Sequence, residues 1–187
     1  AALESKASTV LNASGIGLTV VDLENGSSTE ILSIDDLVST NPASSMGYGC
    51  HWIDTPSISP DGTCIFFLHR WEIEGGFFSR LYSIDIDGSK LTLIVNSGTV
   101  NHISVLNNDE VIFDGVSEGG LNKYRKYTFF NKIFKVLSPF YHRFIGTRES
   151  LRQKIISHYY YCSSKSRLTT DIVARDLISV AHPSVFR

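Results

Sequence analysis

The chain has 187 residues, of which 42% are hydrophobic, and its 17 basic and 19 acidic residues give a formal net charge of −2. This length is sufficient for one compact core, and the apolar fraction excludes a chain that is disordered throughout. The apolar runs are short, since Cys64–Leu68 is among the longest. A membrane-spanning helix needs about 20 apolar residues, so no membrane span is expected. The first residues lack the pattern of a signal peptide, which leaves a cytoplasmic and a periplasmic location open.

The charges are distributed unevenly along the chain. Residues 1–120 contain four basic and 16 acidic residues, whereas residues 121–187 contain 13 basic and three acidic residues. The first part therefore carries a net charge of −12 and the second part +10. Such a division indicates either two surfaces with different partners or two oppositely charged faces that attract each other within one fold.

In chain order, the first predicted unit is a hairpin. Leu18–Leu23 and Thr29–Leu32 are rich in β-branched and aliphatic residues, and the turn residues Glu24–Gly26 separate them. Ile34–Ser39 follows and predicts about one and a half turns of helix.

The strongest pattern runs from Thr55 to Val95. Asp61-Gly62 predicts a tight turn, and Ile65–Leu68 predicts a buried strand. Arg80–Ile86 alternates between two faces, Asp87-Gly88 predicts another turn, and Leu91–Val95 predicts a further strand. Four short antiparallel strands in about 40 residues is the size of one propeller blade.

Later segments continue this pattern. Two predicted pairs of strands follow, at Val100–Val105 with Val111–Phe113 and at Lys123–Phe130 with Lys132–Val136. Lys154–Cys162 and Arg167–Val173 also favour strands, although a helix over Leu151–His158 is an alternative. We therefore predict an all-β chain, a β-propeller or partial propeller of about four blade-like units. One domain spans residues 1–187, with a central blade at 55–96, the next blade at 100–136 and a divergent basic part at 137–187.

Two short motifs carry a family resemblance. Ser59-Pro60-Asp61-Gly62, together with Leu81-Tyr82 and Asp85-Ile86-Asp87-Gly88, resembles the TolB-type, WD-like propeller repeat. Residues 16–115 more closely resemble the propeller family of oligogalacturonate lyases and their uncharacterised relatives. The lyases are seven-bladed, metal-dependent enzymes that cleave short acidic uronide oligomers by β-elimination. A complete propeller of that family needs about twice this length, so the resemblance implies a fragment, a degenerate member or part of a larger assembly.

The resemblance implies a set of site residues. His51, His69 and His102 match the recurrent histidines of the family, which implies one bound divalent metal, Mn or similar, and Arg80 matches the recurrent arginine. Ser79 stands where the lyases have a glutamine, and Arg70-Trp71 replaces their acidic, glycine-containing run. At these positions the chain resembles the uncharacterised relatives more than the lyases. Some of those relatives are associated with polysaccharide biosynthesis. Catalytic residues therefore stay unassigned.

Spacing gives a parallel argument for the same histidines. His51 precedes the first strand of the predicted central blade, His69 ends its second strand, and His102 lies on the first strand of the next blade. Innermost strands of adjacent blades meet at one channel, and imidazole ligands suit Mn, Fe, Ni, Cu or Zn. The alternative is that each histidine makes hydrogen bonds between strands.

Four further residues are candidates for ligand binding. Arg80 and Arg70 are candidates to bind a carboxylate group of the ligand. Trp52 and Trp71 are candidates to stack on a sugar ring. The alternative is that both side chains pack in the core.

Three functional hypotheses follow. The first is a binding module for an acidic saccharide or a protein partner, in a polysaccharide-related context and without enzymatic activity. The second is a metal-dependent carbohydrate-active enzyme that uses His51, His69 and His102. The third is a protein-interaction scaffold whose basic second part meets an acidic partner. Nucleic acid is not expected, because alternating strand faces alone produce the basic and aromatic pattern after residue 120. Because unpaired sheet edges associate readily, we also expect either a closed small propeller or a homo-oligomer that covers the edges.

Overall fold

Three antiparallel sheets make up the fold in the computed structural model, which describes residues 8–10, 17–43, 45–46, 50–73, 76–96, 99–115, 158–163 and 171–172. The first sheet contains β1 (Ser8–Val10), β2 (Leu18–Val21) and β3 (Ser28–Leu32) in that order. The central sheet contains β4 (Cys50–Ile58), β5 (Cys64–Ile73), β6 (Gly76–Asp85) and β7 (Thr92–Val95). The third contains β8 (Val100–Val105), β9 (Glu110–Gly115), β10 (His158–Ser163) and β11 (Asp171–Ile172).

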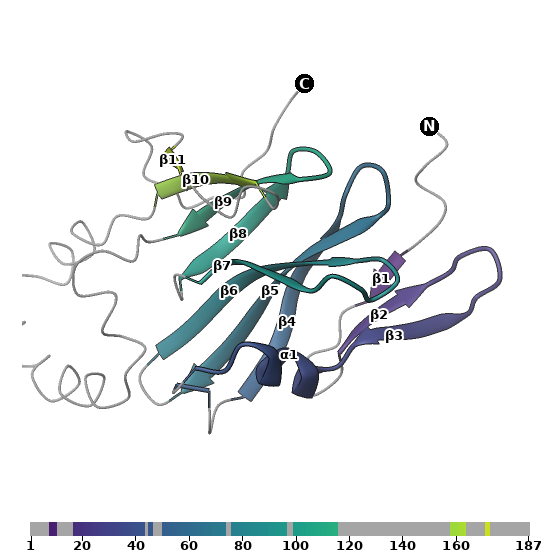
Figure 1. Ribbon diagram of the computed structural model, residues 1–187, viewed down its shortest axis with the longest axis horizontal. Coiled ribbons are helices and arrows are strands. Elements are labelled where there is room, and N and C mark those ends of the chain that lie inside the picture. The colour runs from purple at the N-terminus through teal and green to yellow at the C-terminus, as the bar shows by residue number, and fades with distance from the viewer. Residues whose placement is uncertain are drawn as a thin grey trace, which may run out of the picture.

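The central sheet lies between the other two (Figure 1), and each of its faces packs against one neighbour. One face, which we call the α1 face, carries Ile65, Phe67, Tyr82 and Ile84. These side chains form a core with Leu18 and Leu32 of the first sheet and with Ile34 and Leu37 of helix α1 (Ile34–Thr40). The opposite face, the β8 face, carries Phe66, Leu68 and Leu81, which pack against Val100, Ile103, Val111 and Phe113 of the third sheet.

Local sequence explains the turns. Asp61 accepts hydrogen bonds from the Ser59 hydroxyl at 2.7 Å and from the Thr63 amide at 3.1 Å, while Gly62 adopts a φ of +75°. The Asp87-Gly88 turn repeats this arrangement, because Asp87 accepts from the Ser89 amide at 2.9 Å and Gly88 has a φ of +87°. Both turns were predicted from their Asp-Gly pairs and are confirmed.

A β-bulge interrupts the pairing of β4 with β5 between Asp54 and Ser57. Thr55 adopts a positive φ of 50° there, and Pro56 follows it. Proline cannot donate to a ladder, so it is tolerated on an edge strand and at a bulge, and β4 is the edge strand of its sheet.

The predicted all-β class is confirmed for the described residues, and the predicted helix at Ile34–Ser39 is confirmed as α1. Several strand boundaries differ from the predictions, and two of these differences change the position of a predicted site residue. β4 begins at Cys50, so His51 lies within a strand and not before it, and β5 extends to Ile73, so His69 lies inside the strand and not at its end. The predicted strands were too short because both contain charged and polar side chains, which interrupt the apolar pattern of a strand. Tertiary contacts compensate for the burial of these side chains, and the sequence does not show such contacts.

The third sheet contains a pairing that joins distant parts of the chain. β9 pairs with β10, for instance Phe113 with Tyr160, and β10 pairs with β11, so residues 158–172 supply two strands of this sheet. The predicted strands at Lys123–Phe130 and Lys132–Val136 lie outside the described residues. No helix in the described part of the chain is long and apolar enough to cross a membrane.

Candidate functional site

Four of the seven predicted site residues lie together on the α1 face of the central sheet. The register pairs His51 with Trp71 across β4 and β5, and it pairs His69 with Arg80 across β5 and β6. Cross-strand partners share one face of a sheet, so the four side chains form one patch, which we call the Arg80 site. The site is deeply buried, since Arg80 is 5% exposed, Trp71 2% and His69 0%.

The two histidines of the Arg80 site form one hydrogen-bonded chain. His51 Nδ1 lies 3.0 Å from His69 Nε2, and His51 Nε2 lies 3.0 Å from the carbonyl oxygen of Met46. A carbonyl only accepts, so His51 Nε2 carries the proton, and in neutral His51 Nδ1 is then an acceptor. His69 Nε2 must donate to it. This leaves His69 Nδ1 as an unprotonated acceptor, which is buried and has no hydrogen-bond partner among the residues that the structure describes.

Burial keeps His69 neutral. Removal from water, with smaller contributions from the neighbouring His51 and from the charge of Arg80, lowers the pKa of His69 to about 3. His69 is therefore a fixed hydrogen-bonding group at neutral pH, and its low basicity does not suit it to remove a proton from a substrate.

Arg80 is a buried cation without a carboxylate partner among the described residues. Its guanidinium carbon lies 5.0 Å from the centroid of the Trp71 ring, and its Nη1 donates to the carbonyl oxygen of Asn41 at 2.6 Å. Its Nε is buried and makes no hydrogen bond within the described part of the chain. Buried charges are ordinarily paired, because leaving water costs several kcal/mol per ion. A buried guanidinium with a free donor is therefore a place where an anionic group gains affinity.

The segment after α1 closes one side of the Arg80 site. Asn41 is the C-cap residue of α1 and supplies the carbonyl that fixes Arg80. Ser45 accepts a hydrogen bond from the Trp71 indole at 3.2 Å, and Met46 supplies the carbonyl that fixes His51. Sequence reasoning did not identify these three residues. Two of them act through backbone carbonyls, which leave no signal in side-chain pattern.

Arg70 and Trp52 lie on the other side of the sheet, on the β8 face, and are themselves a cross-strand pair. Arg70 Nε lies 2.8 Å from Asp54 Oδ2, so the two side chains form an ion pair. The angle at Nε does not meet the geometry of a hydrogen bond. Arg70 Nη2 donates to the Asn101 carbonyl at 2.6 Å. The four predicted ligand-binding residues therefore divide into two arginine–tryptophan pairs, one on each face of the sheet.

His102 is separate from the other two predicted metal ligands. It lies on β8, which packs against the β8 face, and its Nδ1 lies 2.9 Å from Asp114 Oδ1. Within the described ranges, no group of three or more His, Cys, Asp or Glu side chains is arranged to hold a metal ion. His51 and His69 alone supply two nitrogen ligands, fewer than the three that catalytic zinc sites use. These residues do not complete a metal site, so no chemical step is derived through a metal.

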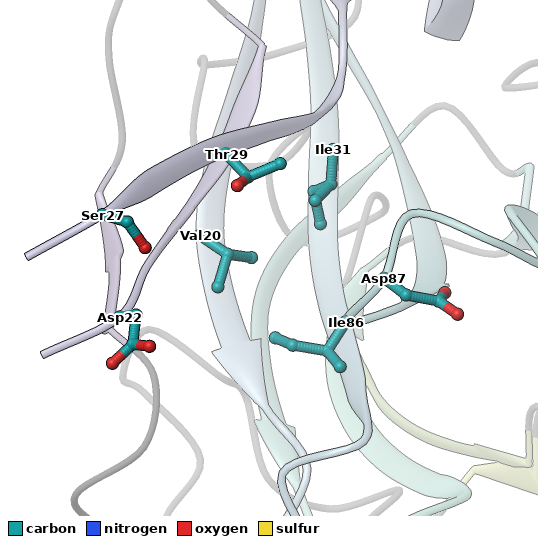
Figure 2. Close-up of a pocket in the computed structure, with 7 residues that line it drawn as sticks. All are labelled: Val20, Asp22, Ser27, Thr29, Ile31, Ile86 and Asp87. Atoms are coloured by element: carbon teal, nitrogen blue, oxygen red, sulfur yellow. The ribbon is translucent and has the colours of Figure 1, made fainter. Parts of the chain in front are cut away.

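A cavity of about 330 Å³ lies elsewhere, between the β2–β3 hairpin and the turn that follows β6. Figure 2 shows Val20, Ile31 and Ile86 between Asp22 and Asp87, whose carboxylates lie at opposite ends of the group. Both carboxylates cap their own turns, because Asp22 accepts from the Glu24 amide and Asp87 from the Ser89 amide. The cavity contains none of the predicted site residues.

Comparisons of the chain with protein-family models, curated proteins and solved structures found no match.

Proposed function

We propose that this chain is a propeller-type binding module that holds the carboxylate of an acidic saccharide at Arg80. The observation that carries the proposal is the buried guanidinium of Arg80, which has no acidic partner among the described residues and keeps Nε unbonded. We place binding before catalysis, because burial leaves His69 weakly basic and both ring nitrogens of His51 are engaged by His69 and the Met46 carbonyl.

Three features support the propeller arrangement. Two of the sheets have four antiparallel strands, and β4 to β7 form a simple meander. The three sheets follow one another in chain order and pack through two successive cores. The first strands of the second and third sheets, β4 and β8, contact each other. These are the relations of neighbouring blades around an axis. Closure of the ring, or a second copy that covers its open edges, stays a prediction.

The chemistry of the Arg80 site fits a uronate residue. A guanidinium binds a carboxylate through parallel N–H donors, and a desolvated pair of this kind is stronger than one in water. His69 Nδ1 is an acceptor without a donor, which suits a sugar hydroxyl next to the carboxylate. A neutral sugar can donate a hydroxyl to His69 Nδ1 but has no carboxylate for Arg80. The module is therefore expected to prefer acidic over neutral saccharides.

Isothermal titration calorimetry with tetragalacturonate and with the neutral β-1,4-galactotetraose tests the proposal. We expect tetragalacturonate to bind more tightly, and we expect Arg80→Gln to weaken it at least tenfold. Arg80→Lys keeps the positive charge but loses the planar guanidinium with its parallel donors. Its affinity for tetragalacturonate should therefore lie between those of wild type and Arg80→Gln. Lys90→Gln is the matched control, because Lys90 is an exposed cation that pairs with Asp85 at 2.7 Å. Equal affinity of wild type and Arg80→Gln would refute the proposal.

A further inference from the structure

A second candidate binding surface lies on the β8 face, on the opposite side of the sheet from Arg80. We call it the Trp52 patch, and it consists of Trp52, Asp54, Arg70, Glu72 and Phe77. Phe77 is 57% exposed, which is unusual in this fold: the only other large hydrophobic side chain exposed in the described ranges is Leu23. Trp52 is half-buried and contacts Phe77 edge to face, with ring centroids 6.0 Å apart and an interplanar angle of 87°. The two rings therefore hold each other in one orientation.

Polar groups of fixed geometry lie beside the two rings. Arg70 is the cross-strand partner of Trp52, and its guanidinium is held by Asp54 on one side and by the Asn101 carbonyl on the other. The Arg70 side chain is 21% exposed and that of Asp54 is 37% exposed, so both reach solvent. An aromatic surface next to a prearranged donor and acceptor is the combination that recognises a sugar ring: the apolar C–H face stacks on the ring, and the hydroxyls meet the polar pair.

The charge of the Trp52 patch selects among sugars. Asp54 compensates the charge of Arg70, and the exposed Glu72, the cross-strand partner of Phe77, adds one negative charge that no cation in the described part of the chain pairs with. A carboxylate on the ligand would be repelled there, in contrast to the Arg80 site.

We infer that the Trp52 patch binds a neutral pyranose residue of an oligosaccharide. A protein partner fits less well, because two aromatic side chains are far smaller than the roughly 800 Å² that each partner contributes to a stable interface. The inference does not depend on Arg80, and the two surfaces are separated by the sheet itself.

The test is a titration of the full chain with two neutral tetrasaccharides, cellotetraose and β-1,4-galactotetraose, followed by calorimetry and tryptophan fluorescence. Trp71 is 2% exposed, so a fluorescence change with a neutral sugar reports on Trp52. We expect Phe77→Ala to weaken binding at least tenfold. Leu23→Ala is the matched control, since Leu23 is also 57% exposed but lies in the β2–β3 turn, and it should leave the affinity unchanged. Phe77→Leu keeps an apolar side chain without the aromatic face, and it should lose affinity while retaining the wild-type circular dichroism spectrum.

Three results would overturn the inference: neither tetrasaccharide binds, Phe77→Ala and Phe77→Leu bind as wild type does, or Phe77 is instead required for self-association in sedimentation. Arg80→Gln separates this site from the proposed acidic site, because it should weaken tetragalacturonate binding at least tenfold and leave the neutral titration unaffected.

Discussion

His51 Nδ1 accepts a hydrogen bond from His69 Nε2 at 3.0 Å, and the carbonyl of Met46 fixes the direction of that bond. The hydrogen bonds therefore define one tautomer for each ring in its neutral form. The last acceptor of the chain, His69 Nδ1, lies in the same buried patch as Arg80. Protonation of His69 would place a second buried cation beside the guanidinium, so the charge of Arg80 adds to the effect of burial in lowering the pKa of His69.

Acid should destabilise the protein through His69. The folded-state pKa is about 3, whereas the unfolded chain has the ordinary value of 6.5. Above pH 6.5 both states are neutral at this residue and the stability is complete. Between pH 6.5 and pH 3 the unfolded state binds a proton that the folded state does not, so stability falls as the pH falls, by up to about 1.4 kcal/mol per pH unit.

Urea denaturation of wild type and His69→Gln at pH 7, 6 and 5 measures this contribution. Glutamine keeps a donor near the position of Nε2 and does not titrate. The difference in unfolding free energy between the two proteins should therefore shrink as the pH falls. A constant difference would show that His69 takes up its proton in the folded state as easily as in the unfolded state.

Arg80→Met should abolish the binding of tetragalacturonate without lowering stability. The substitution removes a buried charge that has no acidic partner among the described residues, and replacing buried ionic groups by apolar ones of similar volume is often neutral or stabilising. The lost contacts, one hydrogen bond to Asn41 and the stacking on Trp71, oppose this gain by about 1 kcal/mol each.

We expect the urea midpoint of Arg80→Met to equal or exceed that of wild type. Loss of binding together with unchanged or higher stability would identify Arg80 as a residue that serves binding at some cost in stability. A loss of more than about 2 kcal/mol would instead make Arg80 a structural residue, and the functional proposal would lose its main support.

The turns and the alternation of strands were predictable because they depend on local chemistry. Asp61-Gly62 and Asp87-Gly88 specify turns through side-chain caps and positive φ angles, whatever the rest of the chain does. The pairing of β9 with β10 was not predictable. Its partners are more than 40 residues apart in sequence, and nothing local distinguishes His158–Ser163 from other aromatic segments.

The candidate site was predictable only in part, for a similar reason. Residue type identified His51, His69 and Arg80, but the face on which each lies depends on strand register. The register brings these three together and leaves His102 with β8, on the other side of the sheet. The contribution of Met46 is a backbone carbonyl, which any residue at that position supplies.

A comparison of two glycines tests how the first sheet packs against the central one. Gly62 and Gly88 both have positive φ, 75° and 87°, so alanine is strained by a similar amount at each, about 1 kcal/mol. A Cβ at Gly62 meets no atom within 4 Å, whereas a Cβ at Gly88 would lie 2.8 Å from the carbonyl oxygen of Ile31 on β3. Gly88→Ala should therefore cost at least 1 kcal/mol more than Gly62→Ala in urea denaturation. Equal costs would mean that β3 does not approach this turn as closely as described.

Removal of single histidines separates a metal site from a structural hydrogen bond. Thermal midpoints of wild type, His51→Ala and His102→Ala are compared with and without a tenfold excess of MnCl₂ or ZnCl₂ after treatment with chelator. Since the sheet separates His102 from the His51–His69 pair, and neither group completes a metal site, we expect no metal-induced shift that depends on both His51 and His102. Loss of the shift in both variants would bring the three histidines onto one ion. That result would restore the metal-dependent enzyme as the leading function, and a β-elimination assay on digalacturonate would then be the next measurement.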